Sequence, residues 1–136
     1  MSYVLRVDNK GEYLHITVTG ANTPENVANY LAEVRDKCVE YHCPNVLIEE
    51  NLRGPSLGPG VIYNIVTEAS NQVWPAVQRI AYIDVNPEHP MEAGQFAETV
   101  AVNRAVNVRL FSSVVDAEKW LREQSRKKPT APDDAT

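Results

Sequence analysis

The segment Asn45–Gly60, NVLIEENLRGPSLGPG, decides the fold of this chain. It begins with the apolar run Val46-Leu47-Ile48, continues into polar residues and breaks into a glycine- and proline-rich loop directly before an amphipathic helix pattern. An apolar run that is too short and too uniform for a half-exposed strand predicts a central strand. Open α/β sheets place their binding sites where such a strand gives way to a loop and a helix N-terminus. We therefore expect the functional site at this segment.

On its N-terminal side the sequence predicts a β-hairpin and one helix. Apolar and polar residues alternate over residues 3–8 and again over 13–19, around a short turn that contains glycine. Two such runs are typical of a hairpin. Thr23 then offers a helix N-cap and Pro24 a proline in the first turn. Apolar residues follow at three- and four-residue steps until Pro44 ends the helix.

On its C-terminal side the sequence predicts three helices and two strands. We expect a helix from about residue 59 to 72, an apolar strand over 79–85, a helix after the loop at 86–91, a less covered strand over 106–110, and a last helix that begins at Ser113. The inward face of the first of these helices is expected to comprise Val61, Ile62, Ile65, Val66 and Ala69. The order ββαβαβαβα predicts an α/β fold with a five-stranded, mostly parallel sheet, an antiparallel first strand and four main helices.

Length and composition indicate one small globular domain. With 136 residues, 43% of them hydrophobic, the chain is long enough to bury a core without disulfides. The net charge of −5 disfavours nucleic acid as a partner, and no apolar stretch is long enough for a transmembrane segment. We expect a folded domain over residues 1–125, a disordered tail over 126–136 and, without a signal peptide, a cytoplasmic location. Cys38 and Cys43 fit neither a disulfide framework nor zinc spacing, so no metal and no cofactor is expected.

Two segments resemble those of a known family. Residues 46–60, VLIEENLRGPSLGPG, and residues 96–121, FAETVAVNRAVNVRLFSSVVDAEKWL, together with the element order, resemble the SpoIIAA-like family. The resemblance covers about residues 3–122 and implies the STAS fold of bacterial anti-sigma-factor antagonists. It also extends to CRAL-TRIO lipid-transfer domains. Ala105 stands where the family usually has glycine, which disfavours a left-handed helix end at this position.

Ser56 is the first candidate site. The resemblance implies a phosphorylatable serine at the start of the helix after this strand, in a pattern like Asp-x-Ser-Gly-Leu-Gly. Residues 54–58, GPSLG, keep the serine, the leucine and a glycine, but not the acid or the glycine after the serine. A phosphate beside a helix N-terminus is favoured electrostatically, and a loop serine that helps to start the helix is the alternative. Arg53 offers an anion contact in the same loop, although Pro55 and Pro59 each remove an N–H donor.

The remaining polar candidates do not assemble a catalytic set. Glu49 and Glu50 are consecutive on a strand and point to opposite faces, so they cannot act as an acid/base pair on one substrate atom. We expect one or both to be solvated at the strand end. His89, in the loop before the third helix, is within reach of a ligand, and an ordinary surface histidine is the alternative. We therefore expect a protein that is not an enzyme.

Trp74 lies in an apolar stretch between the second helix and the next strand. It either caps the core or forms an exposed patch for a partner or a lipid, and a mobile neighbouring helix would uncover an apolar pocket. The sequence thus predicts a non-enzymatic binding or regulatory domain with an apolar small molecule, a lipid or a membrane surface as ligand. The alternative is a protein-interaction switch at Ser56, and a homodimer stays open. The expected contact residues are Arg53, Ser56, Leu57, Val61, Ile62, Ile65, Trp74 and His89.

Overall fold

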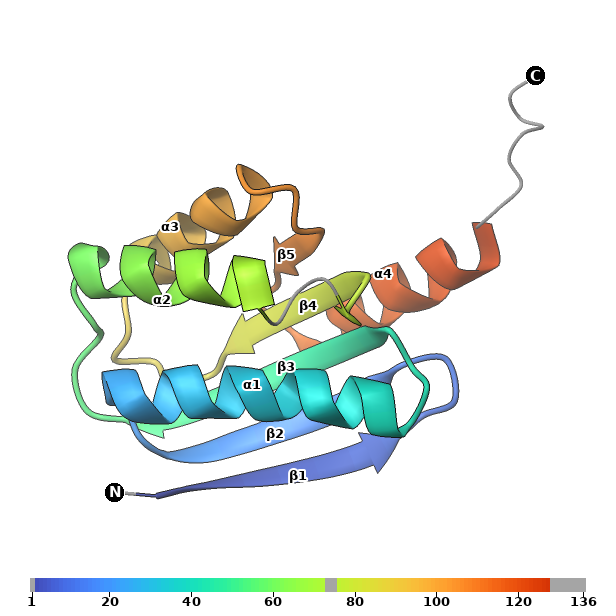
Figure 1. Ribbon diagram of the computed structural model, residues 1–136, viewed down its shortest axis with the longest axis horizontal. Coiled ribbons are helices and arrows are strands. Elements are labelled where there is room, and N and C mark those ends of the chain that lie inside the picture. Colours follow the sequence, from blue (N-terminus) through green and yellow to red (C-terminus); the bar gives the residue numbers. More distant parts are fainter. Residues whose placement is uncertain (1, 73–75, 128–136) are drawn as a thin grey trace.

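The computed structural model describes residues 2–72 and 76–127, and within them a mixed sheet with helices on both faces (Figure 1). The strands lie in the spatial order β1-β2-β3-β4-β5. The elements are β1 Tyr3–Asn9, β2 Leu14–Ala21, α1 Pro24–Glu40, β3 Asn45–Arg53, α2 Pro59–Gln72, β4 Arg79–Asp84, α3 Met91–Val102, β5 Val108–Leu110 and α4 Val114–Lys127.

The pairing of the strands confirms the predicted fold class and element order. Strand β1 pairs with β2 antiparallel, and every later neighbour in the sheet pairs parallel. One row of paired residues crosses four strands, from Ile16 through Ile48 and Tyr82 to Leu110. Because side chains opposite one another in a sheet point to the same face, this row gives the sheet a continuous apolar surface.

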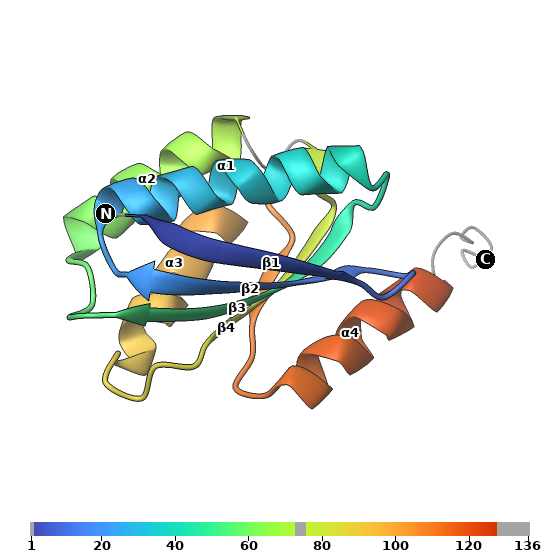
Figure 2. The same ribbon diagram turned by 90° about the horizontal axis from the view of Figure 1, so that it is seen from below.

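The helices form two layers of unequal size. Helices α1, α2 and α3 cover one face of the sheet and α4 covers the other (Figure 2). The larger core lies under the three helices and contains Ile16, Ile48 and Val34. The smaller core lies under α4, where Leu121 packs against Leu47. Strand β3 therefore contributes alternate side chains to two cores, as expected for a central strand.

Local signals in the sequence explain where the helices begin. The Thr23 hydroxyl accepts a hydrogen bond from the Asn26 N–H at 3.1 Å, so the predicted N-cap of α1 is confirmed. Ser113 caps α4 through the Asp116 N–H at 3.2 Å. Helix α4 continues to Lys127, two residues past the predicted end of the folded domain, and the rest of the predicted tail lies outside the described residues.

Two local expectations were wrong. Ala105 has a φ of 68°, so the chain leaves α3 through a left-handed residue even without the glycine typical of the family. Strand β3 runs on to Arg53, well past the apolar run 46–48, because every residue from Val46 to Arg53 pairs with β2. Glu49 and Glu50 consequently lie inside a central strand and not at its end.

Gly20 is the one glycine that a close backbone approach requires. It has a φ of 144°, and a Cβ at this position would lie 2.9 Å from the Cα of Tyr3. A side chain here would push apart the paired ends of β1 and β2.

Candidate functional site

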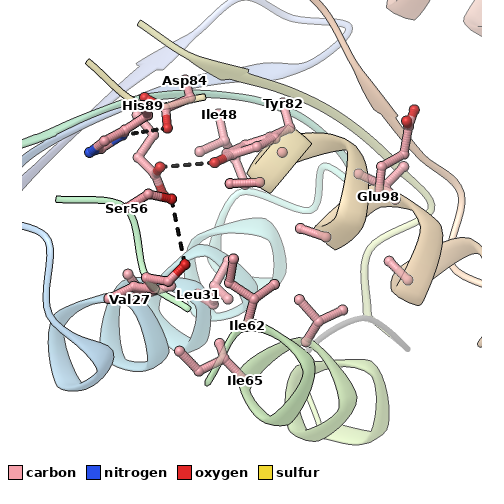
Figure 3. Close-up of a pocket in the computed structure, with 18 of the residues that line it drawn as sticks. Val27, Leu31, Ile48, Ser56, Ile62, Ile65, Tyr82, Asp84, His89 and Glu98 are labelled. Carbon is pink, nitrogen blue, oxygen red and sulfur yellow. Dashed lines mark hydrogen bonds and ion pairs between the residues drawn. The ribbon is translucent and has the colours of Figure 1, made fainter. Parts of the chain in front are cut away.

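A cavity of about 120 Å³ lies between the sheet and helices α1, α2 and α3 (Figure 3). Its helix side carries Val27 and Leu31 from α1 and Ile62 and Ile65 from α2, and its sheet side carries Ile48. Its polar lining consists of Asn22, Tyr30, Glu50, Ser56, Tyr82, Asp84, His89 and Glu98. The cavity is large enough for several water molecules or one small organic group.

Glu50 is the buried carboxyl of this cavity, with 6% of its surface exposed. It lies on the same face of β3 as Ile48, as the alternation of side chains along a strand requires. The Tyr30 hydroxyl of α1 donates a hydrogen bond to Oε2, and the Tyr82 hydroxyl of β4 donates to Oε1 at 2.9 Å. The expectation of a solvated side chain is therefore wrong for Glu50, because β3 extends beyond it.

The surroundings of Glu50 shift its pKa upward, to about 7 from an ordinary 4.5. Burial is the largest cause, and the hydrogen bonds from Tyr30 and Tyr82 act in the opposite direction. The nearby charge of Asp84 raises the pKa further, whereas His89 lowers it. Burial also raises the pKa values of both tyrosines well above 10, so their hydroxyls remain protonated donors.

His89 ties two loops together at one end of the cavity. Its Nδ1 lies 2.7 Å from Asp84 Oδ2, and its Nε2 lies 2.7 Å from the Gly54 carbonyl oxygen. Since both partners accept, both ring nitrogens donate, which requires the imidazolium form. Burial alone lowers the pKa of His89, but the hydrogen bonds to Gly54 and Asp84 outweigh it and the pKa is raised.

The sequence left open that His89 is an ordinary surface histidine, but its side chain is buried. Only 3% of its side chain is exposed, against 20% for Asp84. The Asn86 amide strengthens the same connection by donating to the Leu52 carbonyl at 2.8 Å. The loop after β4 therefore holds the loop after β3, in which Ser56 lies, against the end of the sheet.

The cavity brings together only part of the set of residues predicted from the sequence. Ser56, Leu57, Ile62, Ile65 and His89 line it. Ser56 is half-buried, and its hydroxyl donates to the Leu57 carbonyl at 3.5 Å. In Figure 3, Ser56, Asp84 and His89 lie at one end of the cavity and Glu98 lies at the other.

The other predicted residues lie elsewhere. The prediction that Val61 faces inward was wrong. It is 37% exposed because it lies on the solvent-facing side of α2, in the first turn. Arg53 is exposed at the end of β3 and does not line the cavity. Trp74 lies outside the described residues.

Most of the ionisable side chains with full charges that line the cavity are acidic. Three carboxyl groups line it, those of Glu50, Asp84 and Glu98, and His89 is the single basic side chain among the described lining residues. The Glu98 Oε2 atom accepts the Leu110 N–H at 2.9 Å. Because the ring of His89 already donates to two partners, no described cationic group in the lining is free to receive an anion.

The rest of the described chain offers little reactive chemistry. Burial raises the pKa of the Cys38 thiol to about 12, which makes it a poor nucleophile. On the opposite face of β3, Glu49 pairs with His15, with 2.8 Å between Oε1 and Nε2. Within residues 2–72 and 76–127 no cluster of three or more His, Cys, Asp or Glu side chains has the arrangement of a metal site, and no helix there is long and apolar enough to cross a membrane.

The sheet order, the antiparallel first strand and the division of the helices into three and one define this chain as an α/β domain of the STAS fold. A solved structure of an anti-sigma factor antagonist from Mycobacterium paratuberculosis has a TM-score of 0.56 with it, at 12% sequence identity over 88% of this chain and 94% of that chain. This similarity confirms the predicted STAS fold. The NMR structure of the protein TM1081 matches at a TM-score of 0.48 and 15% identity, over 85% of this chain and 86% of that one. No protein-family model and no curated protein matches the chain.

Proposed function

We propose that this chain is a non-enzymatic regulatory domain that binds a partner protein through the loop at residues 53–60 and the exposed side of α2. The observation that carries the proposal is the shared fold with an anti-sigma factor antagonist. The proposed surface includes exposed Arg53 and, on α2, Val61 and Tyr63 with 37% and 44% of their surfaces exposed. Exposed apolar side chains next to a charged rim are typical of protein interfaces.

Ser56 is the proposed point of control for this surface. A phosphate on its hydroxyl would add negative charge at the end of the cavity that already holds Asp84. Repulsion from this carboxylate and from Glu50 opposes the half-buried position of Ser56, while the imidazolium of His89 attracts the phosphate. We expect the balance to displace the loop, because burial strengthens the repulsion between like charges.

Site-specific photo-crosslinking in the native host tests this proposal. A photo-reactive amino acid replaces Val61 on α2, and the matched control replaces Val115 on α4, which is 72% exposed on the opposite side of the sheet. We expect one protein to be captured from position 61 and not from 115, and its capture to fall in the Ser56→Asp variant. Equal capture from both positions, or no effect of Ser56→Asp, contradicts the proposed surface or its control, respectively.

The cavity favours a second candidate function, the binding of a small, mostly apolar ligand under α2. Five aliphatic side chains, Val27, Leu31, Ile48, Ile62 and Ile65, face a common space that also contains a buried carboxyl. A titration with n-butanol tests whether a ligand fills this space, with the backbone amide chemical shifts measured by NMR at each addition. Shifts that concentrate at Ile48 and Ile65 support the ligand function, and shifts scattered over the surface contradict it.

A further inference from the structure

We propose that the cavity under α1, α2 and α3 recognises a primary alkylammonium group, with Glu50 as its counter-ion and the aliphatic side chains of α1 and α2 around its carbon chain. This inference rests on the ligand-binding function proposed above and adds the chemistry of the ligand's polar end. The argument depends on the hydrogen bonds of Glu50, on the charges around it and on the size of the cavity.

Glu50 has acceptor capacity beyond the two hydrogen bonds that the described residues donate to it. Each carboxylate oxygen accepts one hydrogen bond, Oε1 from Tyr82 and Oε2 from Tyr30. A carboxylate offers about four lone-pair positions, so two remain for donors of a ligand. An ammonium group carries three N–H donors and a full positive charge, which matches a buried carboxylate that forms no ion pair with the described residues.

The charges around Glu50 select against an anionic ligand. Asp84 and Glu98 line the same cavity, and neither lysine nor arginine is among the described lining residues. His89 is cationic, but its two N–H groups donate to Asp84 and to the Gly54 carbonyl. A fatty-acid carboxylate or a phosphate would therefore meet carboxyl groups without a free donor, which is unfavourable in a partly buried site.

The dimensions of the cavity favour a short chain. A dry cavity of about 150 Å³ in another protein holds benzene, so about 120 Å³ accommodates an aliphatic group of roughly four carbons. Figure 3 shows Leu31, Ile62 and Ile65 on the helix side of this space and Ile48 and Tyr82 on the sheet side. A butyl chain between these two walls would place its polar end toward the carboxyl group on β3.

The alternative is that Glu50 acts only as a structural link between α1 and β4 through the two tyrosines. The two roles differ in their response to pH. A structural link needs no ionised carboxyl, whereas an ion pair with an ammonium group does. Because the pKa of Glu50 is about 7, the ionised fraction rises about tenfold between pH 6 and pH 8, and the affinity for an amine should rise with it. Among the residues that the structure describes, the other titratable groups that face this space are Asp84, Glu98, His89, Tyr30 and Tyr82.

The test compares n-butylamine, n-butanol and butyrate as ligands of the full chain, by calorimetry and by amide chemical shifts at pH 6 and pH 8. A primary amine stays protonated at both values. We expect butylamine to bind at least tenfold more tightly than butanol at pH 8, and butyrate to bind most weakly. The affinity for butylamine should fall about tenfold at pH 6, in proportion to the ionised fraction of Glu50.

Two variants and one control complete the experiment. Glu50→Gln should bring the affinity for butylamine down to that for butanol and remove its pH dependence, whereas Glu49→Gln, on the opposite face of β3, should not. Ala97→Leu, which fills the cavity without replacing Glu50, should prevent the binding of all three ligands. A blocked lysine that binds as well as butylamine identifies a partner's lysine side chain as the source of the ammonium group, and a blocked lysine that does not bind identifies a free amine.

The outcomes separate the two levels of the proposal. If butanol binds in the cavity but butylamine binds no more tightly at pH 8, or if Glu50→Gln leaves the preference for the amine intact, the ammonium inference is overturned and the ligand function stands. If none of the three ligands binds, the ligand function itself is overturned.

Discussion

The most direct consequence of the buried carboxyl is a loss of stability as the pH rises. The pKa of Glu50 is about 7 in the folded protein and 4.5 when the side chain is exposed. A group whose pKa is raised by folding contributes stability that is fully present below its unfolded value and is lost as the pH rises through its folded value. The stability contributed by Glu50 is therefore lost between about pH 4.5 and pH 7. The difference between the two pKa values corresponds to a loss of roughly 3 kcal/mol in the free energy of unfolding.

The substitution Glu50→Gln isolates this contribution. Glutamine keeps a carbonyl that accepts from one tyrosine and an amide that donates to the other, but it does not ionise. We expect the free energy of unfolding of the wild type to fall, relative to that of the variant, by about 3 kcal/mol between pH 4.5 and pH 8. At pH 8 the variant should be the more stable protein, because it buries no charge.

Urea denaturation at closely spaced pH values measures this difference, with circular dichroism to follow unfolding. Comparing the variant with the wild type at each pH cancels the contribution of the titrating groups that Glu50 does not influence. The pKa of His89 depends on the charge of Glu50, so the measured difference includes this coupling. Glu49→Gln is the matched control, since it removes the neighbouring carboxylate and leaves the Glu50 hydrogen bonds in place. Parallel curves for the wild type and Glu50→Gln over this range would refute the reasoning.

Three further predictions concern other parts of the fold, and each is checked by the free energy of unfolding. His89→Ala should lower the free energy of unfolding by about 2–4 kcal/mol, because two charge-assisted hydrogen bonds are lost. This loss should be largest below pH 6.5 and should become smaller as the pH rises through the raised pKa of His89. Ala105→Gly should raise the free energy of unfolding by about 1 kcal/mol, because glycine adopts a φ of 68° without strain. An unchanged free energy of unfolding would contradict this prediction. Gly20→Ala should lower the free energy of unfolding more than Gly11→Ala does. Both glycines have a positive φ, but only at Gly20 would an added Cβ meet Tyr3. Equal losses of stability in the two variants would contradict a steric effect of this contact.

Most of the fold could be predicted because its signals are local. The alternation of apolar residues in β1 and β2, the N-cap at Thr23 and the cap at Ser113 each act within a few residues of the sequence. Their order then limits the topology, since helices that alternate with strands require parallel crossovers. The prediction was weakest at strand ends, where the length of β3 depends on pairing with strands distant in the sequence.

The centre of the candidate site was missed for this same reason. The polar run Glu49-Glu50-Asn51 looks like a strand end, yet a period of two already groups Val46, Ile48, Glu50 and Leu52 on one face. A glutamate between Ile48 and Leu52 in that series is a signal for a buried carboxyl, if the strand is allowed to continue. The sequence did single out His89 as a candidate, but it gave no signal for the contact with Gly54. This partner lies 35 positions away and is brought near only by the pairing of β3 with β4.

The two candidate functions share one electrostatic unit. The charge of Glu50 raises the pKa of His89, and the charge of His89 lowers that of Glu50, so each ionised form stabilises the other. His89 in turn holds the Gly54 carbonyl, two residues before Ser56 in the proposed partner surface. A cation bound to Glu50 would weaken its support of the imidazolium and thereby the attachment of this loop. A ligand in the cavity would therefore act on the position of the loop through Glu50 and His89, and so on the same proposed surface as a phosphate on Ser56.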